Sequence, residues 1–124
     1  MKLRLLGKDS TPTNSPTLYA TDQDSYVVQG WIVTERATLA RLAVGEDETL
    51  VEVPAALLEY LAADGLDGQV VNMVSPIVAV TPGGHYIMQG RQVTDAEALS
   101  QMSIPEHETC VQVDKSAMLT LVGG

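Results

Sequence analysis

The pattern of hydrophobic and polar positions predicts a set of short strands and helices that occurs twice along the chain. Each half opens with two β-rich runs separated by turn-forming residues, which is typical of a hairpin. A short helix with apolar residues at i, i+3 spacing, a third strand with alternating apolar residues and a closing helix follow in the same order. The expected strands cover residues 18–21, 26–33 and 49–53 in the first half and 77–81, 86–93 and 109–113 in the second. The expected helices cover residues 35–43 and 55–63 in the first half and 95–103 and 115–122 in the second.

The two halves are also similar residue by residue at a constant offset of 60 positions. Residues 15–61 align with residues 75–121 without a gap, and 15 of the 47 aligned positions are identical. Average amino-acid usage would give about three identities by chance. The identical pairs include Tyr26/Tyr86, Gln29/Gln89, Gly30/Gly90, Val51/Val111 and Val53/Val113. We therefore predict a tandem duplication of a ββαβα unit.

A unit of about 50 residues is too small to bury enough apolar surface by itself, so the two units are expected to share one core. We therefore predict a single globular α+β domain with an internal pseudo-two-fold axis, which remains a monomer because it already contains both halves of the pseudo-dimer. Residues 1–14 are expected to form a flexible N-terminal arm and residues 15–68 the first repeat unit. Residues 69–124 are expected to form a linking strand, over 69–74, followed by the second repeat unit.

Composition and charge narrow the function classes. Hydrophobic residues make up 45% of the chain but aromatic residues only 4%, with no phenylalanine, so the core must be aliphatic. Sixteen acidic against seven basic residues give a net charge of −9, which argues against direct binding of nucleic acid. The one long apolar stretch, around residues 70–80, is interrupted by Asn72, Ser75 and Pro76, so we expect no membrane span. The apolar segment after Met1 is too short for a secretory signal, and we expect a cytoplasmic protein.

Few residues offer catalytic or metal-binding chemistry. Cys110 and His107 are three positions apart, but Cys110 lies inside an expected strand, so a buried core thiol is the favoured interpretation. The turn containing Glu106, His107 and Glu108 offers metal-ligand side chains together with His85, but adjacent residues in a turn do not normally converge on one ion. We therefore expect no catalytic residue, no metal site and no cofactor.

The candidates for binding a partner or a ligand lie in the second strands of the two halves: Tyr26, Gln29, Trp31, Tyr86, Gln89 and Arg91. Gln29 and Gln89 each precede a mid-strand glycine, where a bulge or a close backbone approach is the usual reason for that residue. Because a buried glutamine needs hydrogen-bond partners, each is interpreted as bonding a neighbouring loop or the other half, with ligand recognition as the alternative. Trp31 is either a core residue or an exposed interface anchor, and Arg91 is aligned with it in the second half.

Three segments of the first half carry a resemblance to a known group of proteins. They are Ser-Pro-Thr-Leu-Tyr-Ala-Thr (15–21), Tyr-Val-Val-Gln-Gly-Trp (26–31) and Thr-Leu-Val-Glu-Val-Pro-Ala-Ala-Leu-Leu-Glu-Tyr-Leu (49–61). This unit resembles small acidic actinobacterial proteins of unknown function whose genes neighbour Xre-type helix-turn-helix regulators. Residues 54–61 are also similar to the Pro-Ala-x-Trp-x-x-Phe-Leu segment of a short domain family from the same neighbourhoods. The resemblance implies a partner of the neighbouring regulator, or half of a toxin–antitoxin pair, with no catalytic residues.

The charge, the missing catalytic constellation and this resemblance together predict a non-enzymatic, acidic protein-interaction or regulatory module. Its expected partner is a basic DNA-binding regulator of the helix-turn-helix type or a toxin–antitoxin component. The alternative is a small-ligand-binding protein or enzyme with a cleft between the two repeat units, lined by Tyr26, Tyr86, Gln29 and Gln89.

Overall fold

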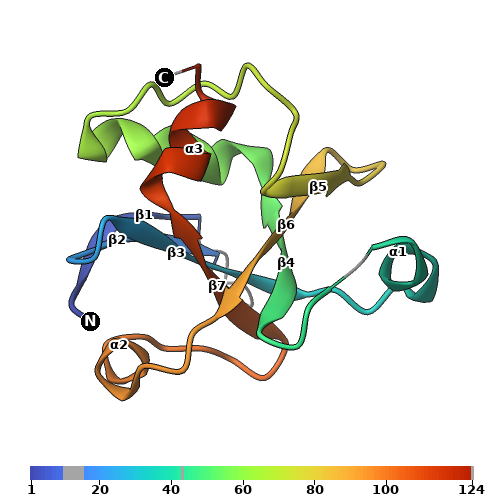
Figure 1. The fold of residues 1–124 in the computed structure, drawn as a ribbon, viewed down its shortest axis with the longest axis horizontal. Helices are drawn as coiled ribbons and strands as arrows, with labels where there is room; N and C mark the ends of the chain where they lie inside the picture. The colour runs from blue at the N-terminus through green and yellow to red at the C-terminus, as the bar shows by residue number, and fades with distance from the viewer. Residues whose placement is uncertain (10–15, 43, 124) are drawn as a thin grey trace.

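A computed structural model of the protein describes residues 1–9, 16–42 and 44–123 (Figure 1). The fold is α+β, with a seven-stranded antiparallel sheet and short helices at its periphery. The strands are β1 (Leu3–Lys8), β2 (Thr17–Thr21), β3 (Ser25–Ile32), β4 (Glu48–Pro54), β5 (Ile77–Val80), β6 (His85–Gln92) and β7 (Glu108–Asp114). The helices are α1 (Arg36–Arg41), the 3-10 helix η1 (Ala55–Asp64), α2 (Ala96–Ser100) and α3 (Lys115–Leu121).

The elements of the two halves follow each other in the same order, 60 residues apart. β2, β3, α1, β4 and η1 are matched by β5, β6, α2, β7 and α3, and the strands β3 and β6 begin and end at corresponding residues. The expected strands and helices are therefore present within one to a few residues of their predicted bounds. The α+β class is confirmed.

Two expectations about the segments outside the halves are wrong. Within the supposed flexible arm, Leu3–Lys8 forms strand β1 and pairs antiparallel with β2, while residues 10–14 lie outside the described residues. The alternating Lys2-Leu3-Arg4-Leu5 is a strand pattern, and the edge of β2 supplies its hydrogen-bond partners. The supposed linking strand over 69–74 is not a strand, because the backbone N–H groups of Val71 and Asn72 both donate to the carbonyl of Leu121 instead.

The first helix of each half also departs from expectation at its start and on its apolar face. Each helix begins one residue later than expected, with Glu35 and Asp95 as the N-caps, and Asp95 accepts a hydrogen bond from the backbone N–H of Ala98 at 2.8 Å. Apolar residues at i, i+3 spacing predict a buried face for these helices, but two of them, Leu39 and Leu99, are 42% and 38% exposed. These helices therefore lie at opposite sides of the molecule rather than over its centre (Figure 1).

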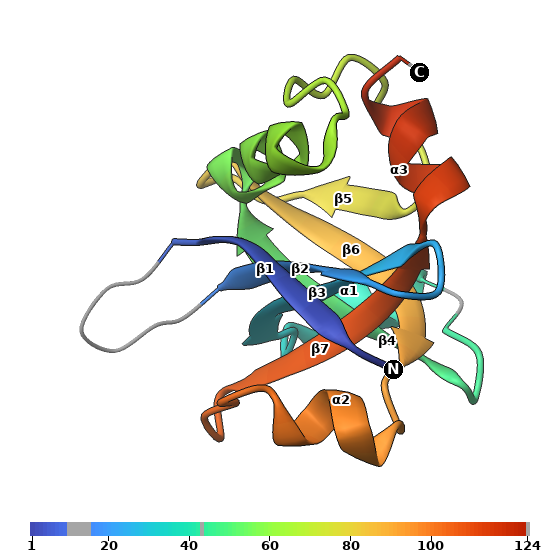
Figure 2. The ribbon, with the colours of Figure 1, turned by 90° about the vertical axis from the view of Figure 1, so that its left-hand side faces the viewer.

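Strand pairing crosses between the halves. β3 pairs along its length with β7, and β6 pairs along its length with β4. Shorter contacts join β3 to β4 and β6 to β7, so these four strands close into a ring. The third strand of each half is therefore held mainly by the second strand of the other half. Figures 1 and 2 show these four strands crossing at the centre of the molecule.

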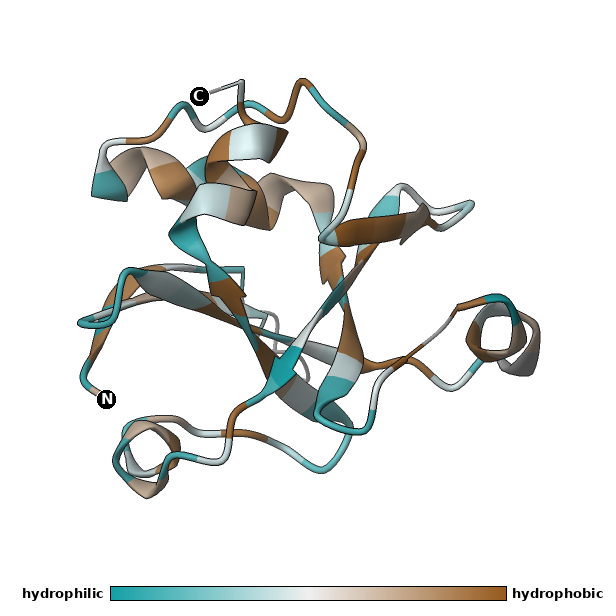
Figure 3. Cartoon of the chain, viewed as in Figure 1, coloured by the Kyte–Doolittle hydropathy of each residue, from teal (hydrophilic) through white to brown (hydrophobic). Residues whose placement is uncertain are grey.

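The main core lies inside this ring and beneath η1 and α3. Its buried side chains come from both halves, including Val51 and Val53 of β4, Val111 and Val113 of β7, and the leucines of η1. Figure 3 shows hydrophobic colours on the central strands and hydrophilic colours on most turns. Gly30 and Gly90 lie where strands cross closely, because a Cβ atom would sit 2.5 Å from the carbonyl oxygen of Glu52 or 2.7 Å from that of Gln112. Of the two expected reasons for these glycines, a bulge or a close backbone approach, the structure shows the close approach.

Candidate functional site

A groove runs between α1 and β5 on the outer side of the ring, with a volume of about 440 Å³. We call it the α1–β5 groove; it is lined by Ile32, Val33, Thr34, Glu35, Thr38, Arg41, Glu52, Ala79, Val80, Thr81, Pro82 and Ile87. Val33 and Ile87 belong to a second, small apolar cluster beneath it. Ile32 is 44% exposed and Val80 52% exposed, so the groove presents apolar surface to solvent. The carboxylates of Glu35 and Glu52 lie in the same lining.

Trp31 stands next to this groove in a small aromatic and acidic cluster. Its ring stacks on His85 with centroids 5.0 Å apart and an interplanar angle of 28°. His85 Nδ1 lies 2.8 Å from Oε2 of Glu52, which is a lining residue of the groove. Trp31 is half-buried, between the two interpretations that its sequence left open. Sequence reasoning missed this cluster, since Trp31 and His85 are far apart in the chain and share no motif.

Tyr26 is buried and bonded within the protein. Its hydroxyl donates a 2.6 Å hydrogen bond to Oδ2 of Asp64, and Asp64 also forms ion pairs with Arg4 and Lys115. Burial, and then the hydrogen bond to Asp64, raise the pKa of the Tyr26 hydroxyl. Burial alone would raise the pKa of Asp64, but the Tyr26 hydrogen bond and the charges of Lys115 and Arg4 hold it below its ordinary value. This cluster joins β1, β3, η1 and α3.

The two repeated glutamines bond across the halves. Gln29 is buried, and its amide nitrogen donates to Glu108 Oε1 at 2.8 Å and to the carbonyl of Ser103 at 2.9 Å. Gln89 donates to Glu48 Oε1 at 3.0 Å. Glu48 and Glu108 are themselves 60 positions apart, so one contact is the counterpart of the other. Both glutamines thus bond the opposite half, and Gln29 in particular is enclosed by protein.

The remaining two candidate residues lie in different places. Tyr86 lines a pocket of about 640 Å³ together with residues of η1 and of the segment 67–70. Arg91 is exposed and pairs with Asp114, its Nη2 lying 2.8 Å from Oδ1. The six candidate residues therefore do not surround one cavity. Trp31 is the member of the set that adjoins the α1–β5 groove.

The side chains with reactive chemistry are dispersed or buried. Burial raises the pKa of the Cys110 thiol to about 11, so the thiol is protonated at neutral pH. His107 Nε2 lies 3.4 Å from Oε2 of Glu108, whereas His85 pairs with Glu52. The two histidines are therefore not brought together at the 106–108 turn. Among the described residues, no group of three or more His, Cys, Asp or Glu side chains could hold a metal ion. In the same part of the chain, no helix has both the length and the apolar character needed to cross a membrane.

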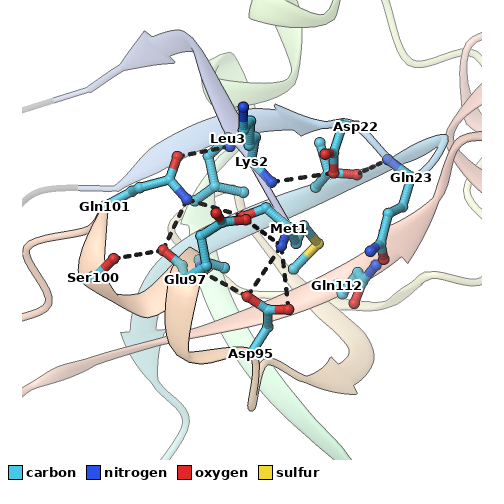
Figure 4. Close-up of polar contacts among 12 residues, drawn as sticks. Met1, Lys2, Leu3, Asp22, Gln23, Asp95, Glu97, Ser100, Gln101 and Gln112 are labelled. Carbon is cyan, nitrogen blue, oxygen red and sulfur yellow. Dashed lines mark hydrogen bonds and ion pairs between the residues drawn. The ribbon is translucent and has the colours of Figure 1, made fainter.

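The counterpart of the α1–β5 groove, which lies between α2 of the second half and β2 of the first, is occupied by the first residues of the chain. Gln101, which follows α2, holds them by two bonds, accepting from the backbone N–H of Leu3 and donating to the carbonyl of Met1, each at 2.9 Å (Figure 4). The Met1 ammonium lies 2.7 Å from Glu97 Oε1 and 3.3 Å from Asp95 Oδ1, and the hydrogen bond to Glu97 raises its pKa. The amino-terminal segment thus lies between β2 and α2.

Comparison of the chain with protein-family models, with curated proteins and with solved structures found no match.

Proposed function

We propose that the protein is a non-enzymatic, acidic protein-interaction module that binds a basic partner at the α1–β5 groove. The observation that carries this proposal is the exposure of Ile32 and Val80 in a groove whose lining also contains Glu35 and Glu52. Apolar side chains gathered in a concave surface with a charged border are typical of a protein-binding site. The half-buried Trp31 beside the groove adds a residue type that is enriched at binding hot spots.

We further propose that the molecule arose by tandem duplication of a ββαβα unit and that a pseudo-two-fold axis relates its halves. The matching element order, the exchanged pairing of β3 with β7 and of β6 with β4, and the paired glutamine contacts support this. Duplication matters for function because corresponding surfaces of the two halves then differ only by their substitutions. One of these surfaces is covered by the chain itself, and the other is the α1–β5 groove.

The partner that we propose is a cytoplasmic, basic DNA-binding regulator of the helix-turn-helix type, or a toxin–antitoxin component, as the sequence resemblance implies. The net charge of −9 supports a basic partner, since opposite charge speeds association and excludes acidic competitors. The proposal that the protein is not an enzyme is supported by the burial and high pKa of Cys110 and by the separation of the histidines.

Co-purification from the native host tests the proposal. The full chain should retain, at physiological salt, a basic DNA-binding protein identified by mass spectrometry, and the two purified proteins should then bind each other with an affinity that falls as salt rises. The double variant Ile32→Ser/Val80→Ser should lose at least about tenfold in affinity. Met73→Ser is the matched control, because Met73 is similarly exposed but does not line the groove. A protein that elutes alone, or a partner that binds the double variant as well as wild type, would contradict it.

A second candidate function rests on the pocket beside Tyr86. This pocket of about 640 Å³ lies between η1 of the first half and Tyr86 of the second, and Glu59 and Asp67 also line it. Its size is within the range of small-molecule sites. A panel of metabolites screened by thermal shift should then contain a compound that raises the Tm of wild type but not of Tyr86→Leu. A panel in which no compound makes this distinction rules the pocket out as a site for the classes tested.

A further inference from the structure

We propose that the α1–β5 groove receives an extended, basic segment of the partner protein, which adds to β5 as an antiparallel strand in the way that β1 adds to β2. This inference rests on the proposed function and specifies how that partner is recognised. Strand addition at a sheet edge gains affinity from main-chain hydrogen bonds and specificity from alternate side chains. The structure already contains one example of the interaction, made by the chain with itself.

The occupied example is the pairing of β1 with β2. Leu3, Arg4 and Leu5 pair with Thr21, Ala20 and Tyr19, respectively. The residues of the second half that correspond to this edge are Ala79, Val80 and Thr81, all of which line the α1–β5 groove. In the described part of the chain, β5 is the last strand on its side of the sheet. The edge that β1 covers in the first half is therefore open in the second.

The backbone groups of Val80 point toward this open edge. The N–H of Thr81 donates to the carbonyl of His85 in the hairpin with β6, at 2.9 Å. Since consecutive residues of a strand direct their backbone groups to opposite edges, Val80 directs its N–H and carbonyl away from β6. On the other half, the N–H of Asp22 donates to the carbonyl of Lys2, which places Ala20, two residues earlier, on the edge that faces β1. Ala20 and Val80 are at corresponding positions, but the strand edge at Ala20 is covered by β1 and the strand edge at Val80 is open.

Among the described residues of the second half, no strand covers the outer edge of β5. The residues that correspond to β1 in the second half, 60 positions further along the chain, are 63–68. They form the end of η1 and the turn after it. Gly65 begins this turn with a left-handed backbone, φ +84°, and its N–H caps the last turn of η1. Because this stretch belongs to η1 and its turn, it does not cover β5, and we assign the added strand to the partner protein.

The groove differs from its counterpart in ways that define the occupant. Where Asp95 and Gln101 face the first residues of the chain, the groove has Glu35 and Arg41. Arg41 offers donors for main-chain carbonyls, and Glu35 and Glu52 favour lysine or arginine in the incoming segment. Ile32 and Val80 favour apolar residues alternating with those basic ones. Pro82 has no N–H group, so the ladder of the added strand ends at Val80.

A peptide with the sequence of residues 1–8, Met-Lys-Leu-Arg-Leu-Leu-Gly-Lys, is a suitable probe, because the protein already binds this sequence as a strand. Added to the nitrogen-15-labelled full chain, it should shift the amide signals of residues 78–81 and 35–41 in a saturable manner below about 1 mM. A control peptide with glutamate at its three basic positions should bind at least about tenfold more weakly. No saturable shift, or shifts confined to β2 and α2, would overturn the inference.

Two variants of the full chain separate backbone from charge recognition. Val80→Pro removes an N–H group that does not bond to β6, so the fold should tolerate the substitution. The affinity for the peptide should nevertheless fall by at least about tenfold. The control variant Val80→Thr keeps the N–H group and should bind the peptide within about threefold of wild type. Glu35→Lys should weaken binding of the basic peptide, whereas Glu46→Lys, exposed but outside the groove, should not. Equal binding by Val80→Pro and wild type would overturn strand addition.

The same variants distinguish failure of this inference from failure of the proposed function. If the DNA-binding partner is captured by wild type and equally by Val80→Pro, the interaction function stands and strand addition at β5 is wrong. If wild type captures no such partner, the proposed function itself is wrong, whatever the peptide does.

Discussion

The side-chain amide of Gln29 donates a 2.8 Å hydrogen bond to Oε1 of Glu108, and both residues are buried. Gln29 belongs to β3 and Glu108 to β7, which comes from the other half of the chain. The counterpart contact, Gln89 to Glu48, is 3.0 Å long and joins β6 to β4. The two halves thus exchange polar contacts as well as strands.

The burial of these two contacts differs, and so should their contributions to stability. Gln29→Ala should lower the free energy of unfolding by about 2–4 kcal/mol, because it leaves a cavity and removes a partner of the buried Glu108 carboxyl group. Gln89→Ala should cost about 1 kcal/mol, since Gln89 and Glu48 are half-buried and water can replace the lost contact. Urea unfolding of both variants measures the difference. A larger loss for Gln89→Ala would show that the half-buried contact carries more of the stability.

Asp64 should make stability fall at acid pH. The pKa of Asp64 is held below its ordinary value of 3.8 in the folded protein. A lowered folded-state pKa contributes stability that is fully present above the unfolded pKa and is lost as the pH falls through the folded one. The free energy of unfolding should therefore decrease below about pH 4, and more steeply in wild type than in Asp64→Asn.

The Asp64→Asn variant should itself be less stable at pH 7 by about 1–3 kcal/mol, because it loses charge-assisted contacts with Tyr26, Arg4 and Lys115. Denaturant unfolding at pH 7 and pH 3.5 provides both comparisons. Parallel pH profiles for wild type and variant would mean that Asp64 does not carry this dependence.

The strand crossing at Gly90 should not tolerate a side chain. A Cβ atom there would lie 2.7 Å from the carbonyl oxygen of Gln112, which is backbone and cannot move aside cheaply. Gly90→Ala should cost about 2 kcal/mol or more. Gly83→Ala is the matched control, because its Cβ would find its nearest neighbour at 3.8 Å and its φ is not left-handed. Thermal unfolding compares them, and equal Tm values would contradict the close approach.

Residues 1–68 expressed alone should not form a folded monomer. This fragment contains β3 and β4 but lacks β7 and β6, the strands with which they pair along most of their length. It should be unfolded, or should associate so that β3 of one copy pairs with β4 of another. Size-exclusion chromatography with circular dichroism distinguishes these states. A monomeric fragment with cooperative unfolding would show that the halves are independent.

Much of the fold could be predicted from the sequence because its strands alternate strongly and its two halves corroborate each other. Val51 and Val53, with Val111 and Val113, mark third strands that the structure contains. Alternation does not specify which strand is the neighbour, so the pairing of β3 with β7 could not be read from the pattern. Strand β1 carried a usable signal, the alternation of Leu3 and Leu5 with basic residues, which the nearby turn-forming residues obscured.

The candidate site was less predictable. The repeat singled out Gln29 and Gln89, which were interpreted as bonding either a neighbouring loop or the other half, and both bond the other half. Tyr26 is also repeated, as Tyr86. Its side chain, however, is buried in the core and donates a hydrogen bond to Asp64 of its own half. The α1–β5 groove left no repeat signal, because what distinguishes it from its counterpart is that no strand in the described part of the chain covers the edge of β5.

Amide hydrogen exchange at Ala20 and Val80 in the full chain tests the central claim most directly. These two residues are at corresponding positions of the two halves. Ala20 pairs with Arg4 of β1, whereas Val80 is 52% exposed at the edge of β5. The Ala20 amide should be strongly protected and the Val80 amide should exchange rapidly, becoming protected when the basic peptide is bound. Slow exchange at Val80 in the free protein would contradict an open edge, and with it the groove as a site for an incoming strand.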